Sequence, residues 1–139
     1  MLKKAHKGFT LLELLIALAI LAIIAAILIP NFFAATDRAR LRSDIQSARV
    51  INNAIELYRA ERGTAPAGDM DTILTTLTTT GFLRARYTDI QTEGAVWATD
   101  AALGVVVDIA GVTSDNVHSI YASLPDAERV LVANGRSSN

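Results

Sequence analysis

The sequence predicts an α+β fold, in which one long N-terminal helix precedes a small head of antiparallel strands and short helices. Apolar residues fill 19 of the 21 positions from Phe9 to Ile29, and apolar positions from Leu41 to Tyr58 recur every three or four residues. After residue 64, strand-like and helix-like patterns alternate. We therefore expect the hydrophobic half of the helix to protrude and its amphipathic half to pack on the head. A length of 139 residues suits one globular domain.

Composition excludes several classes of function. With 13 basic and 14 acidic residues, the chain is not a globally basic nucleic-acid binder. Because it contains no cysteine, it has no disulfide framework and no cysteine-ligated zinc, haem or iron–sulfur site. The charges are unevenly placed, since all three lysines (Lys3, Lys4 and Lys7) precede the apolar run. Without that leader the chain would carry 10 arginines against 14 acids.

The apolar run is long enough to cross a bilayer. A helix from Phe9 to Ile29 would be about 31 Å long, close to the roughly 30 Å of a hydrocarbon core. It is apolar on every face, which excludes a surface helix of a globular domain. The preceding lysines favour a cytoplasmic N-terminus. The arginines that follow the run weaken this preference, because they place positive charge on the other side as well; they are Arg38, Arg40 and Arg42.

Two simpler interpretations of this segment fit less well. A cleavable secretory signal would have a shorter apolar core followed by a cleavage site, but here the chain continues through Pro30 into a helical pattern. A plain membrane anchor leaves Glu13 unexplained, because a carboxylate in an apolar span costs about 2.5–3.5 kcal/mol near the helix centre and less toward its end. A carboxylate in such a place usually has a partner and a function.

The first 33 residues or so resemble the N-terminus of type IV prepilins and pseudopilins. The resemblance lies in a basic leader ending at Gly8, the residues Phe9-Thr10-Leu11-Leu12-Glu13, and an apolar helix interrupted by Pro30. It implies a pilin-like fold with four parts. These are a leader peptide (1–8), a transmembrane or filament-core helix (9–29), an amphipathic continuation of the helix (30–63) and a globular α+β head (64–139).

The resemblance also implies a life cycle. Prepilin peptidase would cut between Gly8 and Phe9 on the cytoplasmic side and methylate the new amino group of Phe9. The mature protein would then span the inner membrane once, with its head extracytoplasmic, surrounded by membrane lipid. An inner-membrane assembly platform would extract it into a helical polymer of identical copies, at the cell surface or in the periplasm. Nucleic acid is not an expected partner.

We expect a structural subunit of a type IV pilus-type filament. A pseudopilin of a type II secretion system is the alternative. A membrane-anchored binding module that never polymerises and a DNA-uptake (competence) pilin are less favoured. The sequence does not choose between pilus and pseudopilus.

Glu13 and Pro30 have physical roles that agree with this expectation. Cleavage before Phe9 creates a cationic amine, which gives the Glu13 carboxylate a partner. In a growing filament the amine of an incoming subunit can meet Glu13 of a neighbour in a low-dielectric core, and this pairing helps to set the axial register. Pro30 removes one backbone hydrogen bond from the helix, and we expect a kink or a local melt there.

The remaining segments predict the parts of the head. The long helix is expected to end at Gly63, and Arg40 and Asp44 on it are spaced for an ion pair across one turn. A short helix capped by Asp69 carries Ile73, Leu74 and Leu77, and a second follows Ser114 and stops at Pro125. Four strands are expected, at Tyr87–Gln91, Ala95–Thr99, Leu103–Ile109 and Arg129–Ala133.

No pattern for catalysis or cofactor binding is present. His118 has Ser119 and Asp115 nearby in sequence, but a catalytic triad needs partners that converge from the fold. We therefore expect no enzyme and no cofactor, and we expect His118 to be a surface or rim residue. Major pseudopilins of type II secretion carry a calcium loop near the C-terminus. The nearest counterparts here, Asp108, Asp115 and Asn116, lack a metal-ligand alternation, so no metal site is expected.

Overall fold

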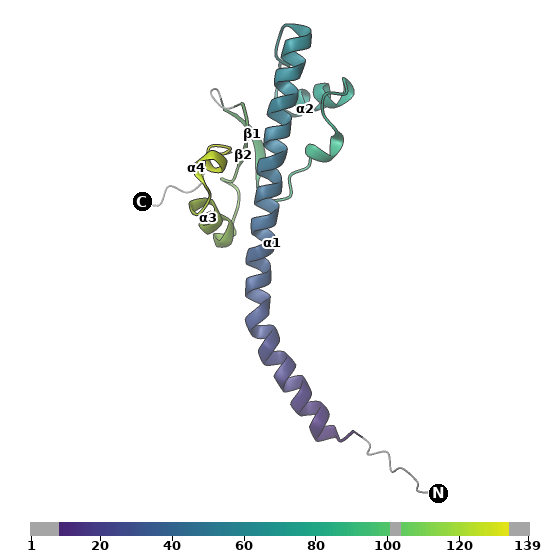
Figure 1. Ribbon diagram of the computed structural model, residues 1–139, viewed down its shortest axis with the longest axis vertical. Helices are drawn as coiled ribbons and strands as arrows, with labels where there is room; N and C mark the ends of the chain where they lie inside the picture. Colours follow the sequence, from purple (N-terminus) through teal and green to yellow (C-terminus); the bar gives the residue numbers. More distant parts are fainter. Residues whose placement is uncertain (1–8, 101–103, 134–139) are drawn as a thin grey trace, which may run out of the picture. The chain divides into compact units, whose positions relative to one another are not determined.

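A computed structural model describes residues 9–100 and 104–133. Its element order is α1 (Leu11–Arg62), α2 (Met70–Thr79), η1 (Ala85–Tyr87), β1 (Val96–Asp100), β2 (Gly104–Asp108), α3 (Asp115–Ala122), α4 (Asp126–Arg129) and β3 (Val132–Ala133) (Figure 1). The chain divides into two compact units, one up to Ala35 and one from Thr36 onward. The α+β, pilin-like fold class predicted from the sequence is confirmed.

Helix α1 begins and ends at local signals in the sequence. Its first hydrogen bond runs from the Leu14 N–H to the Thr10 carbonyl, so Thr10 is the N-cap residue. After Arg62, Gly63 adopts a φ of +77° and donates its N–H to the Arg59 carbonyl at 2.9 Å. A glycine in this left-handed conformation is a common helix stop. The predicted end of the long helix is therefore confirmed.

The first unit consists of the apolar part of α1. Among the described residues, α1 is the one helix long and apolar enough to cross a membrane, and none of its most apolar window is buried. The helix continues through Pro30. Because proline has no N–H, the Ala26 carbonyl loses its regular helical donor. The kink expected at Pro30 stays a prediction.

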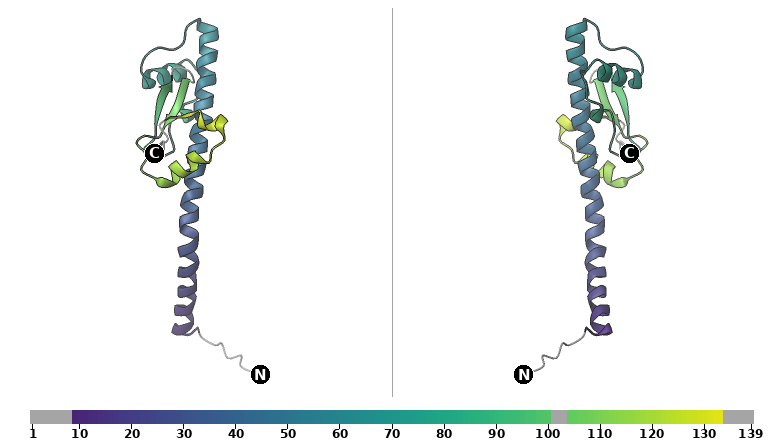
Figure 2. Two further views of the ribbon diagram at one scale, coloured as in Figure 1. Left: turned by 90° about the vertical axis from the view of Figure 1, so that its left-hand side faces the viewer. Right: turned by 90° about the vertical axis from the view of Figure 1, so that its right-hand side faces the viewer.

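The second unit is built around residues 36–62 of α1. Two buried clusters line this part of the helix. The first joins Leu41, Ile45 and Ala48 to the sheet and to α3. The second joins Ile51 and Ala54 to α2 and to Val105 of β2. Figure 2 shows the sheet and α2 alongside this part of the helix. The predicted amphipathic stripe is thus the core of the second unit.

The described strands form a three-stranded sheet in the order β1-β2-β3. β1 and β2 pair antiparallel, with Trp97 opposite Val107. β3 pairs parallel to β2, with Val107 opposite Val132, which differs from the all-antiparallel sheet that the sequence predicted. The connection between the two strands explains this difference. Because α3 and α4 lie between β2 and β3, the chain can cross back before β3 begins, and β3 then runs in the same direction as β2.

Two of the four predicted strands agree with β1 and β2 to within about one residue, although Leu103 lies outside the described residues. Of the predicted strand Arg129–Ala133, the structure forms its last two residues, because α4 ends at Arg129. The strand predicted at Tyr87–Gln91 is wrong. Its backbone is held by distant side chains, since the Trp97 Nε1–H donates to the Thr88 carbonyl and the Gln91 N–H donates to Asp44.

The N-cap of α2 is the residue that the sequence predicted. The Thr72 N–H donates to Oδ1 of Asp69 at 3.0 Å. Hydrogen bonds from the Thr72 side chain and then from its backbone lower the pKa of Asp69 below its usual 3.8. A lowered folded-state pKa stabilises the folded chain above the unfolded pKa, and the contribution is lost as the pH falls through the folded pKa.

We expect Asp69→Ala to weaken α2 at neutral pH and to make no further difference in acid. In the wild type, the protection factors of the amides within Met70–Thr79 (exchange rates corrected for the intrinsic pH dependence) should fall as the pH drops below the usual value of about 3.8 for this carboxyl. Asp69→Asn retains an acceptor oxygen without the charge, so it should keep more protection than alanine and lose the acid dependence. An unchanged acid dependence in Asp69→Asn would refute this assignment.

Candidate functional site

The residues predicted for processing and assembly lie around the start of α1. Gly8 lies outside the described residues. Phe9 comes two positions before α1 and has 78% of its surface exposed. Glu13 occupies the first turn of the helix and is also exposed. The positive end of the helix dipole favours a carboxylate at this place.

Thr10 gives Glu13 a second role that the sequence reasoning missed. The Glu13 N–H donates to Oγ1 of Thr10 at 3.2 Å, so the threonine side chain satisfies one of the free donors of the first turn. This bond is one half of a capping box, in which Thr or Ser is followed three residues later by Glu. The spacing Thr10-x-x-Glu13 before an apolar run is the signal that would have revealed it. Glu13 therefore stands at a helix start as well as at the predicted assembly site.

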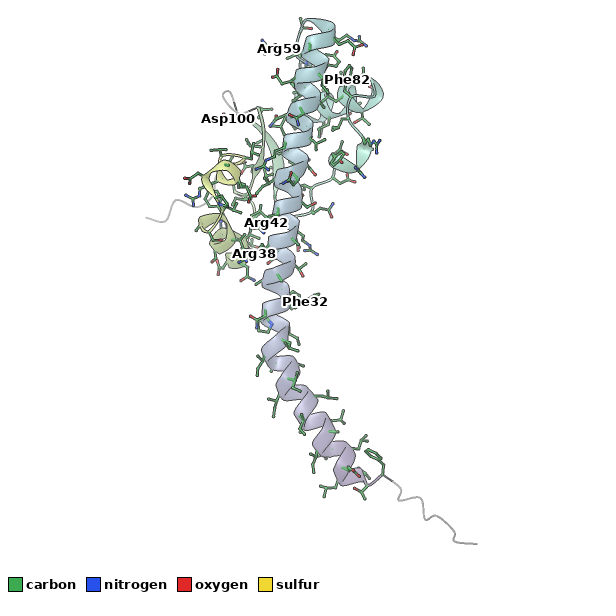
Figure 3. All side chains as sticks on the ribbon, viewed as in Figure 1. Phe32, Arg38, Arg42, Arg59, Phe82 and Asp100 are labelled. Atoms are coloured by element: carbon green, nitrogen blue, oxygen red, sulfur yellow. The ribbon has the colours of Figure 1, made fainter. Side chains whose placement is uncertain are left out.

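The apolar surface of the first unit extends beyond the predicted end at Ile29. All its large apolar side chains, from Leu11 to Phe33, are between 47% and 83% exposed. Phe32 and Phe33 meet edge to face, with ring centroids 6.4 Å apart, and Figure 3 shows Phe32 projecting from the helix. An uncovered apolar surface of this size requires lipid or other apolar helices around it.

Asn31 interrupts this surface less than its side chain suggests. Its Nδ2 donates to the Ile27 carbonyl at 3.1 Å, which satisfies one amide donor within the helix itself. A polar group bonded in this way is less costly to place in an apolar environment. The apolar stretch therefore continues past Pro30 to Ala35, the last residue of the first unit.

The structure does not assemble a metal site from the calcium counterparts. Oδ1 of Asp108, at the end of β2, accepts from the Ala110 N–H at 2.8 Å in a local turn. Asp115 and Asn116 are exposed in the first turn of α3. Over residues 9–100 and 104–133, no group of three or more His, Cys, Asp or Glu side chains is placed to hold a metal ion.

His118 on α3 forms a hydrogen bond with the backbone of the loop that precedes this helix. Its Nε2 lies 3.0 Å from the Val112 carbonyl oxygen, and because a carbonyl oxygen can only accept, this nitrogen is the donor. The ring thus ties α3 to the loop that follows β2. His118 is half-buried, which is compatible with the surface or rim position expected from the sequence.

Asp44 is a buried carboxylate of the second unit, and the partner predicted for it from the sequence is wrong. It is fully buried on α1, with a relative exposure of 0%. Its Oδ1 accepts from the Gln91 N–H and its Oδ2 from the Thr92 N–H, both at 2.8 Å. The predicted ion pair with Arg40 is not formed, because the carboxylate points into the core and Arg40 is exposed.

Asn52 joins α1 to the sheet through a similar pair of bonds. Its Nδ2 donates to the Val105 carbonyl at 2.9 Å, and its Oδ1 accepts from the Val105 N–H at 2.7 Å. The amide thus pairs with β2 as a neighbouring strand would. Gly104 beside it has a φ of +82°, and a Cβ there would lie 2.6 Å from Oδ1 of Asn52. This close approach requires glycine.

Comparisons with known proteins found similarity at the N-terminus of the chain. Residues 3–29 match the family model described as the prokaryotic N-terminal methylation motif. The chain is 48% identical over 58 residues to the type IV wide pilus major component PilA4 of Thermus thermophilus, an alignment that covers 40% of this chain and 42% of that protein.

Two further relatives extend the comparison. The fimbrial protein EcpC of Eikenella corrodens is 29% identical over 114 residues, which are 81% of this chain and 74% of EcpC. The type II secretion system core protein G of Aeromonas hydrophila is 29% identical over 66 residues, 48% of this chain and 46% of that protein. The matches to PilA4 and core protein G thus span less than half the length of those proteins. No solved structure matches the chain significantly.

The chain carries the N-terminal methylation motif and is a homologue of type IV pilins and of the type II secretion pseudopilin G, as its first residues predicted.

Proposed function

We propose that this chain is a structural subunit of a type IV pilus-type filament. It is processed between Gly8 and Phe9, N-methylated at Phe9 and polymerised through α1. The observation that carries the proposal is the methylation motif of residues 3–29, which includes an apolar helix exposed on every side and Glu13 in its first turn. The chain's homologues are structural filament proteins rather than enzymes.

In this proposal each part of the chain has one task. The leader (1–8) is the recognition segment for prepilin peptidase. The helix of residues 9–29 holds the subunit in the inner membrane and later lies in the filament core. The continuation (30–63) carries the head (64–139), which stays extracytoplasmic. Partners are further copies of the chain, the peptidase, the assembly platform and, before assembly, membrane lipid.

The exposed helix can pass from the membrane into a filament without exposing its apolar side chains to water. In the membrane its side chains contact lipid tails, and in a bundle of identical helices they contact one another, so their apolar surroundings are kept. The Glu13 carboxylate is the exception, because lipid offers it no counter-charge. The methylated amine of a neighbouring Phe9 is a cation that can reach it, and this pairing favours one axial position of the incoming subunit.

A pseudopilin of a type II secretion system is the second candidate. The relatives that favour it are the core G proteins, whose alignments cover about half of this chain. EcpC, a fimbrial protein, aligns over 81% of the chain and so reaches well into the head. This longer match is why we place the pilus subunit first.

The proposal is tested by maturation and by microscopy. Expressed with a prepilin peptidase, the 14.9 kDa precursor should yield a chain that begins at N-methylated Phe9, as read by intact mass and N-terminal sequencing. Cells without the peptidase are the control and should retain Met1. Sheared surface material should contain fibres of the mature chain. A mature protein that still begins at Met1 would remove the mechanism, and a processed chain that yields no fibres would indicate a tethered module.

A further inference from the structure

Three arginines, Arg38, Arg40 and Arg42, lie on the first turns of α1 in the second unit, and we call them the arginine collar. All three are exposed. Arg42 Nε lies 4.0 Å from Oε2 of Glu128, and 57% of its side chain remains exposed. Within the described residues, Arg38 and Arg40 form no hydrogen bond or ion pair. Figure 3 labels Arg38 and Arg42 on the helix.

The two acids that lie among the collar residues in the sequence, Asp37 and Asp44, are engaged within the second unit. Asp44 is buried and bonded to the backbone N–H groups of residues 91 and 92. Asp37 is half-buried, and its Oδ2 accepts from Oγ of Ser114 at 3.2 Å. Acids and arginines alternate here in the sequence, but on the surface the arginines are exposed while Asp37 and Asp44 bond within the second unit.

The collar begins where the apolar stretch ends. Asn31, the one polar side chain between Ile29 and Thr36, has an amide donor bonded within the helix, and Ala35 is followed three positions later by Arg38. A residue at this distance from a membrane-spanning stretch lies at the level of the lipid headgroups. Arginine side chains at such a level extend their guanidinium groups toward that interface.

We propose that the arginine collar binds the phosphate groups of anionic lipids around the membrane-inserted subunit. The inference rests on the proposed membrane anchoring. Arg38 and Arg42, four positions apart, share one face of the helix, whereas Arg40 lies about 200° around it from Arg38. One face of α1 at this level is covered by the rest of the second unit, and the arginines lie on both sides of that face. Such an arrangement suits a headgroup layer, which can contact the whole exposed surface of the helix, whereas a single protein partner would cover one side. Guanidinium groups bind phosphate oxygens in pairs.

The collar then fixes the depth of the subunit before assembly. Each arginine near an anionic surface favours the bound position, and two together shift such an equilibrium by about thirtyfold at low salt. These contacts have to break when the subunit leaves the bilayer. The lipid composition of the membrane therefore influences how readily the subunit is extracted.

A spin label between the arginines tests the collar in the full-length chain. The chain contains no cysteine, so Ala39→Cys, at an exposed position of α1, is a unique labelling site. The labelled chain is reconstituted in phosphatidylcholine vesicles with and without phosphatidylglycerol. The collision rate between the spin label and a water-soluble nickel chelate should fall by about twofold or more when the anionic lipid is present, because the collar then holds the label closer to the membrane. About 1 M NaCl, where the Debye length is near 3 Å, should reverse the change.

Neutralising variants assign the effect to the collar. Arg38→Gln/Arg40→Gln in the labelled chain should abolish the dependence on phosphatidylglycerol. The matched control, Arg59→Gln/Arg84→Gln, removes the same charge at two other exposed positions of the second unit and should retain it. The proposal would be overturned if the collision rate in the parent chain did not depend on anionic lipid, or if both double variants lost that dependence equally. Flotation with neutral vesicles is scored separately, since a chain that fails to float overturns the membrane anchoring itself.

Discussion

Glu13→Gln is expected to abolish filament formation while the processed chain remains in the membrane. The variant removes the charge that the Phe9 amine of a neighbouring subunit would pair with in an apolar core. Losing one partner of a buried charge pair costs about 2–5 kcal/mol, because the other charge is left unpaired. Filament yield in sheared fractions should therefore fall by more than about tenfold. Membrane flotation and the intact mass should be unchanged.

The hydrogen bond between the Glu13 N–H and Thr10 makes this variant informative. If Glu13 mattered only through helix capping, glutamine would serve nearly as well as glutamate, and alanine would be worse. If its charge pairs with the amine, glutamine and alanine fail alike. Thr10→Ala removes the cap and keeps the charge, so it should retain filaments, with a slightly frayed first turn. Normal yield from Glu13→Gln would refute the pairing. Glu61→Gln, at an exposed position near the other end of α1, is the matched control.

Asp44→Ala is expected to lower the free energy of unfolding of the second unit by about 2–4 kcal/mol, because it leaves the buried Thr92 N–H and the part-buried Gln91 N–H without acceptors. Asp44→Asn should be nearly as damaging, since its amide offers one acceptor and turns two donors toward the remaining N–H. Glu56→Ala, an exposed acid on the same helix, is the control and should change stability by less than about 0.5 kcal/mol.

The single tryptophan provides the measurement. Trp97 Nε1 donates to the Thr88 carbonyl, so its fluorescence reports on the segment that Asp44 holds. Urea unfolding of the full chain in detergent should show a lower midpoint for both Asp44 variants. An Asp44→Ala midpoint equal to that of the wild type would show that the two backbone bonds contribute nothing to stability.

Local signals made much of the fold predictable. The period of three or four residues from Leu41 to Tyr58 identified the core-facing stripe, and Gly63 marked the helix end. Asp69 and Ser114 marked the starts of α2 and α3, as the structure confirms. Each of these signals depends on residues within one or two turns of one another. For the same reason the motif around Phe9 was recognisable at once.

The errors come from contacts between distant segments. Asp44 looked like a surface residue because Arg40 lies one turn away, but its true partners are backbone groups at positions 91 and 92. Those same bonds prevent Tyr87–Gln91 from forming a strand, although its side chains favour one. The parallel pairing of β3 depends on where α3 and α4 return the chain, and no pattern within β3 encodes that. Thr10 differs from these, because its capping signal was local and was overlooked.

The pairing of β3 has a consequence for the order of synthesis. Val132 lies in the same buried cluster as Leu41, and the Leu131 carbonyl accepts the Val107 N–H at 2.9 Å. A nascent chain emerges from the ribosome with its N-terminal residues first. Leu41 therefore lacks its packing partner Val132 until nearly all of the later segments have been synthesised. The second unit can close its core only after Val132 has been released. Until then its stripe on α1 needs protection from aggregation and proteolysis, just as the apolar residues ahead of it do.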